Sequence, residues 1–415
     1  MTTYAHLSPT RERWLLLTIA GIQFTHILDF MIMMPLGPQF TRLFGISDAQ
    51  FGLLVSSYTL AAGVSGLAAA TYVDRFDRKR LLLTLYTLFG LSTLACGLSP
   101  NYTVLMVARV AAGLFGGVLS ALAQTIVADV VPFERRGRAM GVVMSAFSVS
   151  TVAGVPMGLF LASHLDWHAP FFGIAALSAV LALGAALTLP RLNQHLLQDN
   201  RPSVWRGIGM VLSERNHQWA FAFSALLMFT GFTIIPFITI YLQTNVGVRP
   251  DQVPYIYLCG GAATLVTARI FGRLADRVGK ARLFHWLALA VMLPIMGITL
   301  LPPAPLWAVL GVSSGLFILL SGRMIPGMAL ITAAANPALR GTFMALNASV
   351  QSAAMGVASF LGGLIISRDS HGLVQHYWVA GLLGVCASAA AVWLSRRLHL
   401  HGSPAHAGPQ RQAAP

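Results

Sequence analysis

Long apolar segments, separated by short polar intervals, make up most of the 415-residue chain. Runs of about 20 apolar residues are long enough to cross the hydrocarbon core of a bilayer as α-helices. Twelve such segments are predicted, near residues 14–37, 50–72, 81–99, 102–127, 139–163, 167–189, 217–242, 252–272, 283–301, 306–332, 342–366 and 376–395. The pattern therefore predicts an all-α polytopic membrane protein with twelve transmembrane helices.

The longest polar interval lies between the sixth and seventh apolar segments and divides the spans six and six. We predict an N-terminal six-helix bundle over residues 1–190, a cytoplasmic linker over 191–215 and a C-terminal six-helix bundle over 216–397. The last segment, 398–415, is rich in proline, glycine and alanine, which predicts a disordered cytoplasmic tail. The two bundles are expected to surround a central cavity.

Composition and charge agree with a membrane protein and also predict its orientation. Only 10% of the residues are charged, against about 25% in soluble domains. The formal net charge is +14, and most basic residues fall in the loops on one side of the predicted spans. The opposite loops contain only Arg42, Arg249 and Arg368. The positive-inside rule therefore places both termini in the cytoplasm, and the net charge does not indicate a nucleic-acid partner.

A charged sequence occurs twice, once in each half. "VDRFDRKR" spans residues 73–80 and "ADRVGKAR" spans 275–282, and each lies between the second and third span of its half. Repeated halves of six spans are a recurrent plan of secondary transporters, in which the substrate site lies between the halves. The repeat thus favours a transporter.

The repeated sequences resemble motif A of the major facilitator superfamily. The second copy carries the motif at Gly272, Asp276, Arg277, Gly279 and Lys280, whereas the first copy has Ala70 and Asp77 where the family has glycine. "LMVARVAAGLFGG" resembles motif B, with Arg109 as its intramembrane arginine, and "AGVPMG" in span five resembles a reduced form of motif C. The chain is most similar to twelve-span drug:proton antiporters and related arabinose-efflux-like permeases.

This resemblance implies two mechanical elements. The charged residues of the two motif A copies would form a latch at the cytoplasmic ends of the helices: Asp74, Arg75, Arg78, Asp276, Arg277 and Lys280. The residues of the motif C segment would form a hinge or seal in span five: Gly154, Pro156 and Gly158. The alternatives are basic loops that only set topology and glycines that only allow tight packing.

Ionisable residues within spans are costly and therefore mark candidate functional sites. His26 and Asp29 lie three residues apart in span one and share a helix face. Arg109 in span four lies at a depth that agrees with Asp29 to about one helical turn. We predict that the three residues form a proton-coupling or substrate site in the N-terminal half. The alternative is a static ion pair that joins spans one and four.

Other polar residues within the spans are candidates for lining the cavity. They are Gln23, Gln124, Arg323, Asn347 and Gln351. Lipid-facing or helix-packing roles compete with this interpretation. For Arg323 the favoured alternative is an anchor at the membrane interface, because its long side chain could extend to the aqueous boundary.

Enzymatic and cofactor-dependent functions find no support in the sequence. The three cysteines lie singly and far apart in apolar runs, which indicates neither a disulfide framework nor a metal site. No Walker A loop is present, so ATP is not implied. We expect no cofactor, no metal and no obligate protein partner.

The sequence as a whole predicts a secondary active transporter of a bacterial inner membrane. Proton-coupled export of a small solute or drug by alternating access is the favoured hypothesis, with protons, the solute and the bilayer as partners. The alternatives are a symporter or uniporter for sugars or organic acids, and a lipid-handling transporter. Neither the charge of the solute nor its identity follows from the sequence.

Overall fold

The computed structural model describes residues 9–190, 192–193 and 204–401. Within this part, twelve helices are long and apolar enough to cross a membrane, with six before and six after the gap at 194–203. Each coincides with one of the predicted spans, and the boundaries differ by a few residues. The prediction of an all-α twelve-span protein is confirmed.

The N-terminal half consists of helices and short helical turns. They are α1 (Pro9–Ile32), α2 (Gly37–Leu43), α3 (Asp48–Tyr72), η1 (Val73–Arg75), α4 (Arg78–Gly97), α5 (Tyr102–Val130), α6 (Phe133–Val149), η2 (Ser150–Gly154), α7 (Val155–His164) and α8 (Ala169–Thr188). Polar side chains fix several helix starts. Ser47 and Gln50 form a capping box at α3, and Asn101 accepts a hydrogen bond from the first turn of α5.

The C-terminal half repeats this plan. Its elements are α9 (Val204–Ser213), α10 (Arg215–Phe232), η4 (Ile235–Phe237), α11 (Ile238–Tyr241), η5 (Leu242–Val246), η6 (Pro250–Gln252), α12 (Val253–Val278), α13 (Lys280–Ala290), α14 (Met292–Thr299), α15 (Leu306–Ala334), α16 (Arg340–Ile365), β1 (Ser367–Arg368), β2 (Val374–Gln375) and α17 (Tyr377–Ser395). The two strands form a small antiparallel hairpin before the last span. Helix α9 lies within the predicted linker and packs on α10 and α16.

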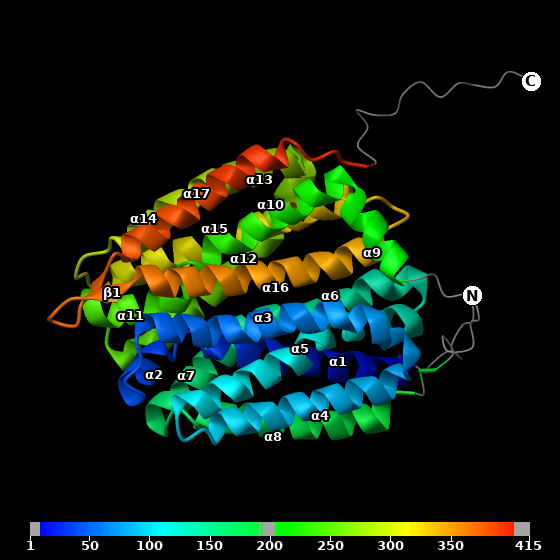
Figure 1. The fold of residues 1–415 in the computed structure, drawn as a ribbon, viewed down its shortest axis with the longest axis horizontal. Coiled ribbons are helices and arrows are strands. Elements are labelled where there is room, and N and C mark those ends of the chain that lie inside the picture. Colours follow the sequence, from blue (N-terminus) through cyan, green and yellow to red (C-terminus); the bar gives the residue numbers. More distant parts are fainter. Residues whose placement is uncertain (1–8, 191, 194–203, 402–415) are drawn as a thin grey trace, which may run out of the picture.

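The two halves lie side by side, with α3 against α16 along their shared boundary (Figure 1). We call the end of the molecule where α1 begins and α17 ends the terminal end, and the end that carries α2, α11 and the hairpin the far end. Glycines let α3 and α16 approach closely, because a Cβ atom on Gly52 would lie 2.7 Å from the carbonyl oxygen of Ser359. On the other side of the boundary, α12 packs on η2 and α7.

The chain after α17 is ordered further than predicted. The backbone N–H of His399 donates to Asn216 Oδ1, and that of His401 donates to the carbonyl oxygen of Ala333. These bonds attach residues 398–401 to the ends of α10 and α15. The predicted tail beyond them, 402–415, lies outside the described residues, as do residues 191 and 194–203 of the predicted linker.

Candidate functional site

Asp29 of α1 and Arg109 of α5 form an ion pair inside the N-terminal half. Arg109 Nη1 lies 2.8 Å from Asp29 Oδ2, and both side chains are fully buried. The same Nη1 group also donates to the backbone carbonyl oxygen of Asp29 at 3.3 Å. Thr93 of α4 donates to the other carboxylate oxygen at 3.2 Å. The ion pair and the Thr93 hydrogen bond therefore join α1, α4 and α5 at one point. The contact between α1 and α5 was predicted from the similar depths of Asp29 and Arg109.

Aromatic and imidazole rings surround the ion pair. The guanidinium carbon of Arg109 lies 4.4 Å from the ring centroid of Tyr58 on α3, a cation–π arrangement. The His26 ring lies 6.2 Å from that of Tyr58 and 5.9 Å from that of Phe89. Gly116 makes room for this arrangement, because a Cβ atom there would lie 2.8 Å from both His26 Cδ2 and Tyr58 Oη.

Several buried polar atoms at this site have no hydrogen-bond partner among the described residues. They are Nε and Nη2 of Arg109, both ring nitrogens of His26 and the hydroxyl of Tyr58. Buried polar atoms are nearly always paired, so unpaired atoms gathered at one place indicate a function or a bound molecule. His26 was predicted to meet Asp29 and Arg109; it lies beside them but forms no hydrogen bond with either.

Sequence reasoning missed two members of this site, Tyr58 and Thr93. Both are uncharged residues in apolar helices, and nothing in their local sequence separates them from the many other tyrosines and threonines. Their role follows only from the packing of α3 and α4 on α5. A hydroxyl within a span is a weak signal, whereas a charge is a strong one.

The predicted hinge in span five coincides with an irregular helical turn. Residues Ser150–Gly154 form a π-helical turn between α6 and α7, and Pro156 follows in the first turn of α7. Such turns often occur at functional sites. Gly154 and Gly158 face α1, where added Cβ atoms would lie 3.0 Å from Leu28 and 2.7 Å from Ile32. The irregular turn of span five thus packs against the helix that carries Asp29.

The residues of the two motif A copies lie at the terminal end of the molecule. Arg78 pairs with Asp129 at the end of α5, within the N-terminal half, and Arg75 is exposed. The side chain of Asp74 lies outside the described residues. The second copy, Asp276, Arg277 and Lys280, is exposed at the turn between α12 and α13. A latch formed by the motif A residues stays a prediction.

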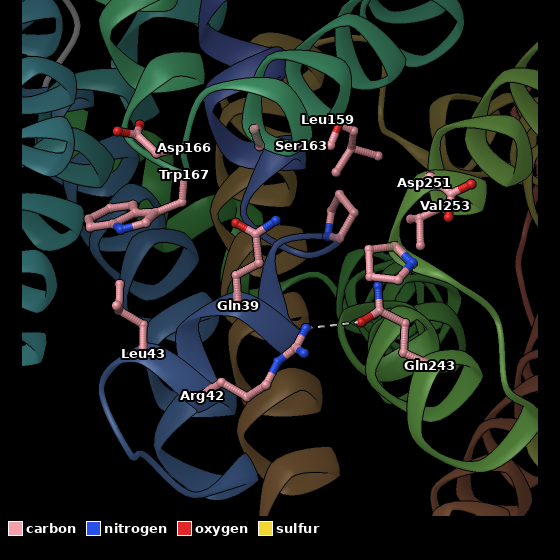
Figure 2. Close-up of a pocket in the computed structure, with 13 residues that line it drawn as sticks. Gln39, Arg42, Leu43, Leu159, Ser163, Asp166, Trp167, Gln243, Asp251 and Val253 are labelled. Atoms are coloured by element: carbon pink, nitrogen blue, oxygen red, sulfur yellow. Dashed lines mark hydrogen bonds between the residues drawn. The ribbon is translucent and has the colours of Figure 1, made fainter.

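The far end, in contrast, is joined by polar contacts between the halves. Asp48 at the start of α3 receives two hydrogen bonds of 2.8 Å from Arg368 in β1. The other ion pairs among the described residues stay within one half. Arg42 of α2 also donates to Gln243 of η5 at 3.4 Å (Figure 2). The far end is therefore closed across the boundary.

A cavity of about 740 Å³ lies beside these far-end contacts. Residues of α2, of the end of α7 and of the C-terminal half line it, and Gln39, Trp167 and Asp251 are drawn in Figure 2. At the opposite end of the boundary, contacts between α3 and α16 reach Gly66 and Ser349, whereas Gly341 at the start of α16 has open space around it. The two halves are therefore in contact from the far end to Gly66 and Ser349.

The candidate cavity residues occupy different environments. Gln23 is buried and accepts a hydrogen bond from Ser120 within the N-terminal half, whereas Gln124 is exposed. Gln351 donates to Ser224. Asn347 and Arg323 are each 1% exposed. The preferred interpretation of Arg323 as an interfacial anchor was wrong, because its guanidinium turns inward to the carbonyl oxygen of Leu227 instead of reaching the aqueous boundary.

Comparison with known proteins identifies the family. The model of the Major Facilitator Superfamily matches residues 19–322 and 220–414. The chain belongs to this superfamily. Among superfamily relatives, it is 26% identical over 347 residues to the uncharacterized MFS-type transporter YtbD of Bacillus subtilis (strain 168), an alignment covering 82% of this chain and 85% of that protein. YceJ of the same organism, also an uncharacterized MFS-type transporter, is 24% identical over 353 residues, covering 85% of this chain and 89% of YceJ.

Solved structures of superfamily transporters share this fold. A bacterial homolog of the human lysosomal transporter Spinster, in an inward-facing and occupied conformation, matches with a TM-score of 0.76 at 18% identity, covering 96% of this chain and 100% of that one. A D-xylose-proton symporter matches with a TM-score of 0.74 at 18% identity, covering 92% and 97%. The chain is therefore a multi-pass secondary transporter of the superfamily with bacterial relatives.

Proposed function

We propose that this transporter exports a small solute from the cytoplasm in exchange for protons, and that Asp29 carries the proton. The observation that supports the proposal most strongly is the fully buried Asp29–Arg109 pair amid polar atoms without partners. Taking two charges out of water is costly, and a carboxylate in such a place gains proton affinity by burial and loses it through a neighbouring cation. Small movements of Arg109 would therefore shift the proton occupancy of Asp29.

The position of the pair suits alternating access. Asp29 lies three residues before the end of α1, toward the far end, which the Asp48–Arg368 ion pair closes. The distribution of basic loops favours a cytoplasmic terminal end, so this conformation would face inward. Opening of the far end would expose Asp29 to external protons, and closure would carry the proton inward.

Export, as opposed to import, is supported by span five. The "AGVPMG" segment resembles the motif of antiporters, and the π-helical turn before Pro156 lies against α1. A bend at this point would couple rocking of the halves to the surroundings of Asp29. We therefore assign to Gly154, Pro156 and Gly158 the role of a hinge.

The test uses everted membrane vesicles that are energised with a proton gradient and contain a pH-sensitive dye. Lipophilic cations, sugars and organic anions are added in turn to vesicles with the wild-type protein, with Asp29→Asn and with Asp251→Asn. We expect one solute class to evoke proton release in the wild type and in Asp251→Asn, whose carboxylate is exposed, but not in Asp29→Asn. Proton release that persists in Asp29→Asn would contradict the assignment.

A further inference from the structure

Arg323 is a buried cation in the C-terminal half that the proton-coupling site does not use. It lies on α15 and is 1% exposed. Nη2 donates to the carbonyl oxygen of Leu227 on α10 at 2.8 Å, and Nε and Nη1 have no hydrogen-bond partner among the described residues. A guanidinium stays charged in proteins, so burial cannot be relieved by loss of its proton.

This arginine has no carboxylate to neutralise it. Between residues 216 and 397 the sequence contains three acidic residues, Asp251, Asp276 and Asp369. Asp251 and Asp276 are exposed at the ends of spans, and Asp369 is partly exposed in the hairpin loop. Arg323 lies about 26 Å along α15 from its start at the far end, well away from Asp251 and Asp369. Arg109 in the other half, in contrast, is paired with Asp29.

Polar groups from two further helices lie at the same level as Arg323. Counted along the helices, Arg323 is about 16 Å from the terminal end of α15, and Gln351 is about 16 Å from that end of α16. Gln351 donates to Ser224 of α10, one turn from Leu227, and also contacts Met328 of α15. One turn before Gln351 on α16, the buried Oδ1 of Asn347 has no partner among the described residues.

We infer that Arg323 binds a negatively charged group of the transported solute, which is therefore an organic anion such as a carboxylate with an apolar body. This inference rests on the proposed transport function and adds the chemical class of the solute. An uncompensated buried cation is costly, and an anion that accepts hydrogen bonds from its free donors removes that cost. Apolar side chains nearby, such as Phe271 against Gly322 and Met328 against Gln351, suit an apolar body.

The experiment measures binding to the purified full chain in detergent, with benzoate as the probe. The midpoint of thermal unfolding is recorded against the concentration of benzoate, of its uncharged amide benzamide and of chloride. The variants are Arg323→Met, Arg323→Gln, Arg323→Lys and the control Arg249→Met, which removes an exposed positive charge at the far end. Asp29→Asn is measured in parallel.

We expect benzoate, but not benzamide or chloride, to raise the midpoint of the wild type and of Arg249→Met. The neutral Arg323 variants should bind benzoate at least about tenfold more weakly, and Arg323→Lys should lie between them and the wild type. Without ligand, Arg323→Met should unfold no earlier than the wild type, because an apolar side chain replaces an unpaired charge. If Arg323 had only a structural role, Arg323→Met would unfold at a lower temperature than the wild type.

Four outcomes would overturn the inference: no stabilisation of the wild type by benzoate, equal stabilisation by benzamide, unchanged benzoate binding by the neutral Arg323 variants, or equal stabilisation by chloride. The last result would indicate a small inorganic counter-ion only. Binding is measured at equilibrium without a gradient, and Asp29→Asn is expected to retain it. A failure of benzoate binding is therefore distinguishable from a failure of proton coupling through Asp29, which the vesicle experiment tests.

Discussion

A carboxylate, a guanidinium, an imidazole and a phenol share one enclosed place among α1, α3, α4 and α5. The charged members were predictable, because Asp29 and Arg109 stand out in apolar segments and their depths agree. The environment was not predictable, because the cation–π contact with Tyr58 and the isolation of the His26 ring depend on how helices distant in sequence pack.

The ion pair yields a prediction about stability. Arg109→Gln leaves Asp29 buried without its partner, so we expect the free energy of unfolding to fall by about 3–5 kcal/mol. The double variant Asp29→Asn/Arg109→Gln should recover part of this loss, because it removes both charges. The measurement is unfolding of the purified protein by heat and by denaturant. If Arg109→Gln is as stable as the wild type, the ion pair does not offset the cost of burying the Asp29 carboxylate.

At the scale of elements, span lengths and the six-plus-six division followed from the sequence because a bilayer fixes how long an apolar helix must be. The breaks within the helical segments could not be predicted from the sequence in the same way. The segment between α10 and α12 breaks into η4, α11 and η5, and a hairpin precedes α17. Such breaks depend on contacts between distant segments, for example the Tyr377 hydroxyl that donates to the carbonyl oxygen of Ile234.

The π-helical turn in span five yields a prediction about rate. Gly158→Val would place side-chain atoms against Ile32 of α1, where a Cβ atom alone lies 2.7 Å away. Overpacking of this kind costs about 1–3 kcal/mol, and here the cost should raise the barrier to movement of α7 past α1. We expect substrate-evoked proton release to slow by about tenfold or more.

The matched control for this change is Gly141→Val in α6 of the same span, where an added Cβ atom meets nothing within 4 Å. It should transport like the wild type. Equal rates for Gly158→Val and Gly141→Val would argue against a hinge at the π-helical turn. Initial rates of dye response, corrected for the amount of protein in the membrane, provide the comparison.

At the scale of the whole molecule, the two halves meet along α3 and α16 and are joined at the far end by Asp48 and Arg368. The sequence predicts charged latches at the terminal end, which stay a prediction, and it did not predict the Asp48–Arg368 pair, because that pair joins residues far apart in the chain. Which end is closed depends on tertiary packing, which a local pattern does not report.

The far-end ion pair yields a prediction about conformational equilibrium. Asp48→Asn should shift the protein toward a conformation open at the far end. A partly exposed ion pair contributes up to about 1 kcal/mol, which corresponds to an increase of up to about fivefold in the open population. The readout is maleimide labelling of Ala162→Cys, a buried position that lines the far-end cavity, in a background without Cys96, Cys259 and Cys386.

Asp251→Asn serves as the control in the same background, because its partner Arg249 belongs to the same half. Its loss should leave the labelling rate of Ala162→Cys unchanged. If Asp48→Asn labels no faster than Asp251→Asn, the ion pair does not hold the far end closed.

The measurement that tests the central claim most directly compares two modes of transport in proteoliposomes containing Asp29→Asn, with a solute identified in the vesicle experiment. Solute exchange between the two sides at equal pH requires binding and alternating access but no net movement of protons. Accumulation driven by a pH gradient requires binding, alternating access and net movement of protons. We predict that Asp29→Asn retains exchange and loses gradient-driven accumulation. Accumulation at the wild-type level would contradict the account, because the proton would then be carried elsewhere.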